Sequence, residues 1–159
     1  MRLILSFWIV ISLMLSACNS GEKMKPMSLL DYGIPLTILV PDSAKVRHRK
    51  LSLEEDITIN GPSNYKLQIF VASKTHANAA KLLADQKELV RQSPFFSKVT
   101  EELPDGLKFE SKIDSTLTYG FRRVRMMGDK EIIFREALLG TFSKEDIDRM
   151  YRSLDPKKK

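Results

Sequence analysis

The side chains that could do chemistry in this sequence are one cysteine, two histidines and a short run of arginines. Cys18 follows the small residues Ser16 and Ala17, which close an apolar N-terminal segment. Because it is the only cysteine among 159 residues, the chain can build neither a disulfide framework of its own nor a cysteine-based metal site. The residues before Cys18 indicate a different use for its thiol.

The segment before Cys18 has the composition of an export signal. Met1-Arg2 is short and positive, and the run from Leu3 to Leu15 is apolar except for two serines. A membrane-spanning helix needs roughly 20 apolar residues, so this run is too short to cross a bilayer. A positive start, a short apolar run and a small-residue exit are typical of a secretory signal peptide. We therefore expect residues 1–17 to be a cleaved signal.

Leu15-Ser16-Ala17-Cys18 resembles the lipobox of bacterial lipoprotein precursors at all four positions. The resemblance implies that signal peptidase II cuts between Ala17 and Cys18 and that the Cys18 thiol carries a diacylglyceryl group. The new amine is then acylated, for example with palmitate, and two or more chains anchor a protein firmly. Asn19 after the cysteine, with only Glu22 acidic nearby, implies the periplasmic face of the outer membrane.

Composition divides the remainder into a tether, one domain and a tail. Residues 18–33 are expected to form the lipidated N-terminus and a flexible tether, because Asn19 to Pro26 combines Gly, Pro and charge without hydrophobic periodicity. Residues 34–155 are long enough for one α+β domain, and residues 156–159 form a basic tail. The net charge of +6 favours a solvated surface, with affinity for anionic lipid headgroups as the alternative.

Alternation of apolar and polar residues predicts a hairpin and a three-stranded antiparallel meander. The expected strands are 36–40, 56–60, 65–71, 107–113, 116–127 and 130–139. The basic stretch 45–51 is expected to be an exposed edge strand or loop. Residues 95–103 fit either a strand or an extension of the preceding helix.

Two helices are expected. Thr75 is a plausible N-cap for a helix that runs to about Gln92 and stops before Pro94. Ser143 and Asp146 have the spacing of a capping box at the start of a C-terminal helix. One face of that helix is apolar and consists of Ile147, Met150, Tyr151 and Leu154.

The order of these elements does not alternate as in parallel α/β folds, so we expect an antiparallel β-sheet with two helices packed on it. Over residues 34–154 the order resembles that of the PsbP-like superfamily. The closing helix adds to this resemblance through Phe142, Ile147, Met150 and Leu154. The resemblance implies an accessory or assembly role and carries over no functional residue.

Arg122, Arg123 and Arg125 share one expected strand, on which Arg123 and Arg125 point the same way and Arg122 points the opposite way. Arg123 and Arg125 are candidate anion-binding residues, since guanidinium groups bind phosphate or carboxylate by two parallel hydrogen bonds. We favour ion pairing across the sheet, with Glu110, Glu131 or Glu136 as partners. The apolar face switches within this strand, which indicates a bulge or a strand covered on both sides.

The sequence contains no hydrolase, zinc-protease, phosphate-loop or dinucleotide motif. His48 lies in a basic run and is expected at the surface, while His76 lies at a helix start, where the dipole opposes protonation. Neither histidine has a carboxylate nearby in sequence at metal-ligand spacing. We therefore expect no catalytic residue, no metal and no cofactor.

The preferred hypothesis is a non-enzymatic envelope lipoprotein that binds or helps to assemble an unidentified envelope partner. The alternative is a small-molecule or lipid-binding module with a cavity between sheet and helices, lined by Phe109, Tyr119, Phe121 and Phe134 with Arg123 at its mouth. A hydrolase would need His48 or His76 beside a carboxylate and a nucleophile. Nucleic-acid binding is rejected, because aromatic and basic residues are not interleaved.

Overall fold

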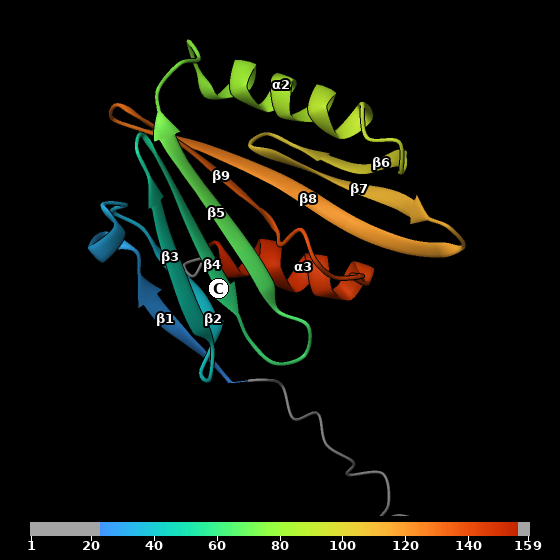
Figure 1. Ribbon diagram of the computed structural model, residues 1–159, viewed down its shortest axis with the longest axis horizontal. Coiled ribbons are helices and arrows are strands. Elements are labelled where there is room, and N and C mark those ends of the chain that lie inside the picture. Colours follow the sequence, from blue (N-terminus) through green and yellow to red (C-terminus); the bar gives the residue numbers. More distant parts are fainter. Residues whose placement is uncertain (1–22, 156–159) are drawn as a thin grey trace, which may run out of the picture.

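A computed structural model of the protein describes residues 23–155. The lipobox residues Leu15, Ser16, Ala17 and Cys18 and the tail 156–159 lie outside the described residues. Within the described range, two β-sheets and two α-helices form one α+β domain, which confirms the predicted fold class (Figure 1). No helix in this range is both long enough and apolar enough to cross a membrane.

The main sheet has seven antiparallel strands in the order β3-β4-β5-β9-β8-β7-β6. Its strands are β3 (Lys45–Leu51), β4 (Glu54–Asn60), β5 (Lys66–Ser73), β6 (Phe96–Leu103), β7 (Gly106–Ile113), β8 (Thr116–Met127) and β9 (Lys130–Glu136). A second sheet pairs β1 (Met24–Ser28) with β2 (Thr37–Pro41), and the 3-10 turn η1 (Leu30–Tyr32) lies between them. Helix α2 (Ala79–Arg91) joins β5 to β6, and α3 (Lys144–Ser153) follows β9.

The two helices cover opposite faces of the main sheet. Phe121 of β8 belongs to the larger core, which α3 and the β1–β2 sheet close. Leu107 and Phe109 of β7 pack instead with Val90 of α2. Leu107 and Phe109 pair with residues 122 and 120 of β8, and successive residues of a strand point to opposite faces. We call the face under α3 the inner face and the face under α2 the outer face.

β8 is therefore covered on both faces. Of the two explanations that the sequence offered for the change of its apolar face, a bulge or coverage on both sides, the second is confirmed. Its pairing with β9 runs without a register shift from Arg122 to Met127, so this part of the strand has no bulge. The capping box at Ser143 and Asp146 and the buried apolar face of α3 are also confirmed. The stretch 95–103, ambiguous in sequence, forms β6.

The start of the domain differs from the prediction. Residues 24–28 were expected to belong to a flexible tether, but they form β1, which pairs along its whole length with β2. Met24 and Met27 pack against the larger core. Backbone pairing and these two apolar contacts outweigh the Pro and charge content that indicated a tether.

Helix α2 begins later than expected. Its N-cap is Asn78, whose Oδ1 accepts a hydrogen bond from the Lys81 backbone N–H at 2.9 Å. Thr75 is not the cap, because its backbone N–H and hydroxyl both donate to Glu131 of β9. β9 also ends at Glu136 rather than at 139, which leaves the side chains of Leu138 and Leu139 exposed on the loop that follows.

The cavity proposed between sheet and helices is not formed by the four aromatic residues suggested for it. Phe121 and Phe134 are 0% exposed and pack within the larger core. Phe109 lies on the outer face with α2 instead. The prediction failed because residues of neighbouring strands share a face according to their register, which the sequence does not state.

Phe134→Ala should lower the free energy of unfolding by about 3–5 kcal/mol, because it leaves a cavity in a close-packed core. Urea unfolding followed by circular dichroism measures this change. Leu53→Ala, at a side chain that is 77% exposed, is the matched control and should change stability by less than about 0.5 kcal/mol. Equal effects of the two substitutions would contradict the assignment of Phe134 to the core.

Candidate binding surfaces

Two of the three β8 arginines hold the C-terminal end of α3 against the sheet. Arg123 Nη2 donates to Asp155 Oδ2 at 2.6 Å, and its Nε donates to Asp105 Oδ2 at 2.8 Å. Arg125 Nη2 donates to the other Asp155 oxygen at 2.6 Å. The Arg123 guanidinium also lies 4.8 Å from the ring centre of Tyr151, whose hydroxyl donates to Asp105. An anionic ligand at Arg123 or Arg125 would have to displace these carboxylates.

The charges of this cluster stabilise one another. Burial raises the pKa of Asp155, but its hydrogen bonds and ion pairs with Arg123 and Arg125 outweigh burial and leave that pKa below its usual value. Burial, the charge of Asp105 and the hydrogen bond to it raise the pKa of Tyr151, so the phenol stays protonated. The cluster therefore joins helix, turn and sheet and contains no group prepared to exchange a proton near neutral pH.

Arg122 points to the outer face and follows the pairing favoured from the sequence. Its Nη1 donates to both oxygens of Glu136, at 3.0 and 3.1 Å. Its guanidinium lies 5.3 Å from the ring centre of Phe109. Glu136 is thus the correct partner for Arg122, whereas Arg123 and Arg125 pair with Asp105 and Asp155, which the sequence did not suggest.

His76 is held between two carboxylates. Its Nδ1 lies 2.8 Å from Glu131 and its Nε2 lies 3.1 Å from Asp85. The hydrogen bond from His76 to Glu131 is the largest effect on its pKa and, with the Asp85 contact, raises it in spite of burial. The sequence argument from the helix dipole predicted the opposite direction and is wrong, because direct hydrogen bonds and ion pairs with these two carboxylates determine the shift.

Both ring nitrogens of His76 face carboxylates, which favour its protonated form and leave neither nitrogen without a partner in the described residues. His48 lies on the edge strand β3, as expected for a surface residue, with Nε2 3.0 Å from Glu55 and its ring against Tyr32. Within residues 23–155, no three His, Cys, Asp or Glu side chains are grouped so as to hold a metal ion.

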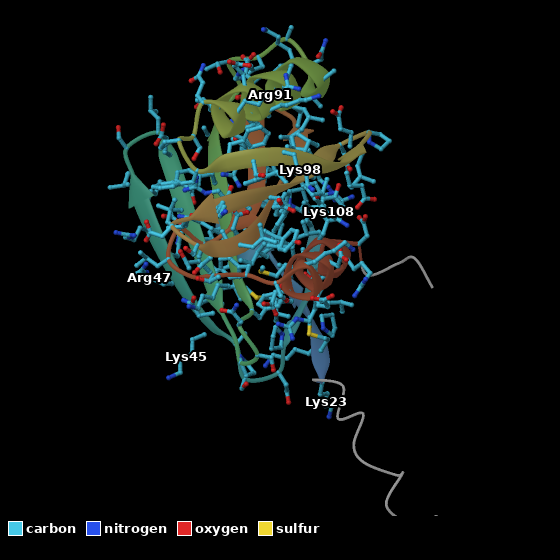
Figure 2. The ribbon with its side chains drawn as sticks, turned by 90° about the vertical axis from the view of Figure 1, so that its right-hand side faces the viewer. Lys23, Lys45, Arg47, Arg91, Lys98 and Lys108 are labelled. Atoms are coloured by element: carbon cyan, nitrogen blue, oxygen red, sulfur yellow. The ribbon has the colours of Figure 1, made fainter. Side chains whose placement is uncertain are left out.

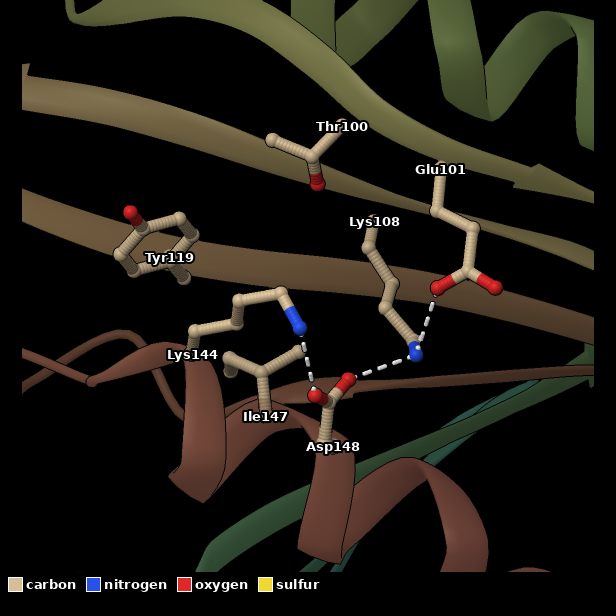
Figure 3. A pocket seen from close by; sticks show the side chains of 7 residues that line it. All are labelled: Thr100, Glu101, Lys108, Tyr119, Lys144, Ile147 and Asp148. Carbon is tan, nitrogen blue, oxygen red and sulfur yellow. Dashed lines mark hydrogen bonds and ion pairs between the residues drawn. The ribbon is translucent and has the colours of Figure 1, made fainter.

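A small hollow of about 100 Å³ lies between β6, β7 and α3 (Figure 3). Lys108 Nζ lies 2.6 Å from Asp148 and 2.8 Å from Glu101, and Lys144 reaches the second oxygen of Asp148 at 3.0 Å. Burial lowers the pKa of Lys108, but these carboxylates outweigh burial and raise it. The amine therefore stays charged, and the hollow is an ion-pair cluster rather than a nucleophilic site.

A larger groove of about 360 Å³ lies on the outer face beside α2. Its walls include exposed apolar side chains, and the Arg122–Glu136 pair lies among its lining residues. The apolar members of the lining are Leu89, Val90, Phe95, Phe109, Ile113, Leu138 and Phe142. A groove of this size with a few polar groups fits a small amphiphilic ligand.

A third groove, about 600 Å³ in volume, crosses the part of the outer face formed by β3, β4 and β5. We call it the basic groove. Four of its lining residues are cations, and none of the described residues that line it is acidic. Its lining consists of Lys45, Val46, Arg47, Arg49, Thr58, Asn60, Lys66, Gln68, Ala137, Leu138 and Leu139. Figure 2 shows Lys45 and Arg47 projecting from the left-hand side of the domain.

Comparisons with protein-family models, curated proteins and solved structures gave no match for this chain. The resemblance to the PsbP-like superfamily and the lipobox therefore stay predictions from sequence.

Sequence reasoning missed the basic groove as a site, although a signal for it was present. Lys45, Arg47 and Arg49 occur at every second position, which places them on one face of a strand. The partners of His76 and Arg123 carried no such signal, because Glu131 and Asp155 are far away in sequence.

Stability should depend on pH through the His76–Glu131 pair. The raised pKa of His76 stabilises the fold fully below the unfolded value of 6.5, and this contribution is lost as pH rises through the folded pKa. Burial raises the pKa of Glu131, but its bonds from His76 and Thr75 lower it overall. Its contribution is therefore present above 4.5 and lost as pH falls through the folded pKa.

His76→Gln should therefore lower the free energy of unfolding most between about pH 4.5 and 6.5, with the difference from wild type shrinking at alkaline pH. Urea unfolding at a series of pH values measures this profile. The matched control His48→Gln leaves the His76 pair intact and should keep the wild-type profile. A difference between wild type and His76→Gln that stays the same from this range up to alkaline pH would contradict the assignment.

Proposed function

We propose that this chain is a lipoprotein of the bacterial cell envelope, anchored through Cys18, whose domain binds another envelope component and catalyses no reaction. The observation that carries the proposal is the lipobox-like Leu15-Ser16-Ala17-Cys18 after a short apolar run. Asn19 favours the periplasmic face of the outer membrane. Attachment by two or more acyl chains would keep the domain at the membrane surface.

The side chains of the domain support a binding role over catalysis. The best candidate for a general base, His76, has both ring nitrogens against carboxylates. Lys108 is held as an ammonium by two acids. The outer face, in contrast, offers two grooves of about 360 and 600 Å³ whose walls include exposed side chains. Such surfaces suit recognition of a partner or ligand.

The anchor is tested by intact-mass measurement of the protein isolated from bacterial membranes. The expected product begins at Cys18 and carries the mass of a diacylglyceryl group and an acyl chain. Cys18→Ala should remain an unmodified precursor, since it lacks the thiol to which the lipid is attached. Ser20→Ala lies in the same segment but leaves the lipobox intact, so it should be processed normally. A free Cys18 thiol in the membrane-derived protein would overturn the proposal.

The groove beside α2 supports a second candidate function, the binding of a small amphiphilic molecule. Leu89 and Phe95 are 60% and 48% exposed at its rim, and Arg122 provides a cation within it. An amphiphile could bury its apolar part against this rim, while its anionic group competes with Glu136 for the Arg122 guanidinium. Of the residues suggested for a cavity between sheet and helices, Phe109 and Tyr119 line this groove, whereas Phe121, Phe134 and Arg123 do not.

Leu89→Ser combined with Phe95→Ser should weaken binding of the fluorescent amphiphile anilinonaphthalene sulfonate by about tenfold or more, because apolar area is lost from the rim. Fluorescence titration gives the dissociation constants. Leu53→Ser, at an exposed leucine outside the groove, is the control and should bind as wild type does. Unchanged binding by the double variant would exclude this groove as the amphiphile site.

A further inference from the structure

The outer face carries an ordered row of cations. Lys45, Arg47 and Arg49 are all exposed on the edge strand β3, at alternate positions about 6.6 Å apart along the strand. Lys66 of β5 lies on the far side of the same basic groove. Charges at this spacing can each contact a different anionic group on a flat surface.

Thr58 and Gln68, which line the basic groove, belong to a fixed polar network with Asp56. Asp56 is not a lining residue, but its carboxylate lies 3.9 Å from the Arg49 guanidinium. Asp56, Thr58 and Gln68 are each no more than 8% exposed. Asp56 accepts hydrogen bonds from Thr58 at 3.2 Å and from Gln68 at 2.9 Å. Gln68 in turn accepts one from Arg135 Nε at 3.0 Å. These bonds satisfy the buried polar atoms and hold these side chains in one geometry.

Two arginines of neighbouring strands face each other on the outer face of the sheet. Arg135 is directly opposite Arg122 in the β8–β9 register, and like charges in such pairs repel. Burial and the charge of Arg122 both lower the pKa of Arg135, although Glu136 and Asp56 act in the opposite direction. An anion placed on this face would relieve the repulsion.

Apolar side chains lie beside these cations. Leu138 and Leu139 are 76% and 83% exposed and form one wall of the basic groove. Lys66 Nζ donates to the Leu139 carbonyl oxygen at 3.4 Å, which fixes this loop to the strand. Exposed leucines next to lysine and arginine side chains are the combination found on proteins that lie in a membrane interface.

The basic groove also has one end near the point where the chain leads to Cys18. The Lys23 carbonyl oxygen accepts a hydrogen bond from the Asp42 backbone N–H at 2.9 Å, and β3 begins shortly after this contact. Figure 2 shows Lys23 and Lys45 toward the same end of the domain, whereas Arg91 and Lys98 lie toward the other end. Cys18 precedes Lys23 by five residues, which span at most about 18 Å.

We propose that the basic groove, with Leu138 and Leu139 on its rim, docks the domain on the anionic phospholipid surface of the membrane that holds the chain. The proposal rests on lipid attachment at Cys18, since that attachment brings the Lys45 end of the groove to the headgroups. Phosphate groups pair with the lysine and arginine side chains, and the two leucines insert between headgroups. Each cation near an anionic surface raises the ratio of docked to undocked protein roughly fivefold.

The test uses the full chain with Leu138→Trp, purified with its native anchor and reconstituted into vesicles. Tryptophan fluorescence is compared between pure phosphatidylcholine and a mixture with phosphatidylglycerol, with the unsubstituted protein as blank. The anchor holds the protein in both vesicles, so only docking changes the signal. We expect a blue shift on the anionic vesicles alone, which high salt reverses.

Arg47→Glu with Arg49→Glu should lower the ratio of docked to undocked protein by about 25-fold or more, because two cations are removed and two acids added. Circular dichroism shows whether this variant folds. If it folds poorly, Lys45→Glu combined with Arg47→Glu is used for the same test. The control Arg91→Glu with Lys98→Glu makes the same charge change at exposed residues of α2 and β6 and should dock normally.

Identical spectra on neutral and anionic vesicles would overturn the proposal. A thermal stabilisation by inorganic phosphate that the Arg47→Glu, Arg49→Glu variant loses, together with identical vesicle spectra, would assign the basic groove to a soluble anion instead. An intact-mass measurement of the same sample shows separately whether Cys18 carries the lipid. A missing lipid therefore contradicts the proposed function, whereas a lipidated protein without the spectral shift contradicts only the docking.

Discussion

The architecture depends on the fact that α2, the helix on the outer face, is too small to cover the whole of that face. Helix α2 has 13 residues and is therefore about 20 Å long, while seven strands span about 29 Å from first to last. A helix about 10 Å wide cannot cover that surface, and α2 packs on β8 and β6. The outer face of β3, β4 and β5 is left to polar and basic side chains, and both outer grooves lie along the edge of this coverage.

The arginines of the sheet divide into two groups according to which face they occupy. On the inner face, Arg123 and Arg125 are partly or fully buried, and a buried guanidinium needs carboxylate partners. Asp105 and Asp155 supply them and fasten α3 to the sheet. On the outer face of β3, Arg47 and Arg49 are exposed to water, and among the described residues Arg49 has only a long ion pair with Asp56 at 3.9 Å. The inner arginines are therefore structural, whereas Arg47 and Arg49 expose their guanidinium groups to solvent.

The first strand connects this surface to the proposed anchor. Because β1 pairs with β2 from Met24 onward, the folded domain begins six residues after Cys18. A longer flexible tether would let the domain rotate freely above the membrane. With the lipid attached at Cys18 as proposed, the few residues before β1 would keep the Lys23 end of the domain near the membrane, and the charged outer face would then influence the orientation of the domain.

The sequence by itself determined the class of the fold and most of its elements. Alternation at 107–113 and the Ser143–Asp146 capping box are local signals, and local periodicity and turn chemistry produce them directly. It also supplies the lipobox, whose consequences stay a prediction. Only the tertiary structure decided which residues meet: Glu131 with His76, Asp155 with Arg123, and Phe109 with Val90 of α2. Strand register and helix placement control those contacts, and both depend on how the whole chain buries its apolar surface, which no local stretch of sequence encodes.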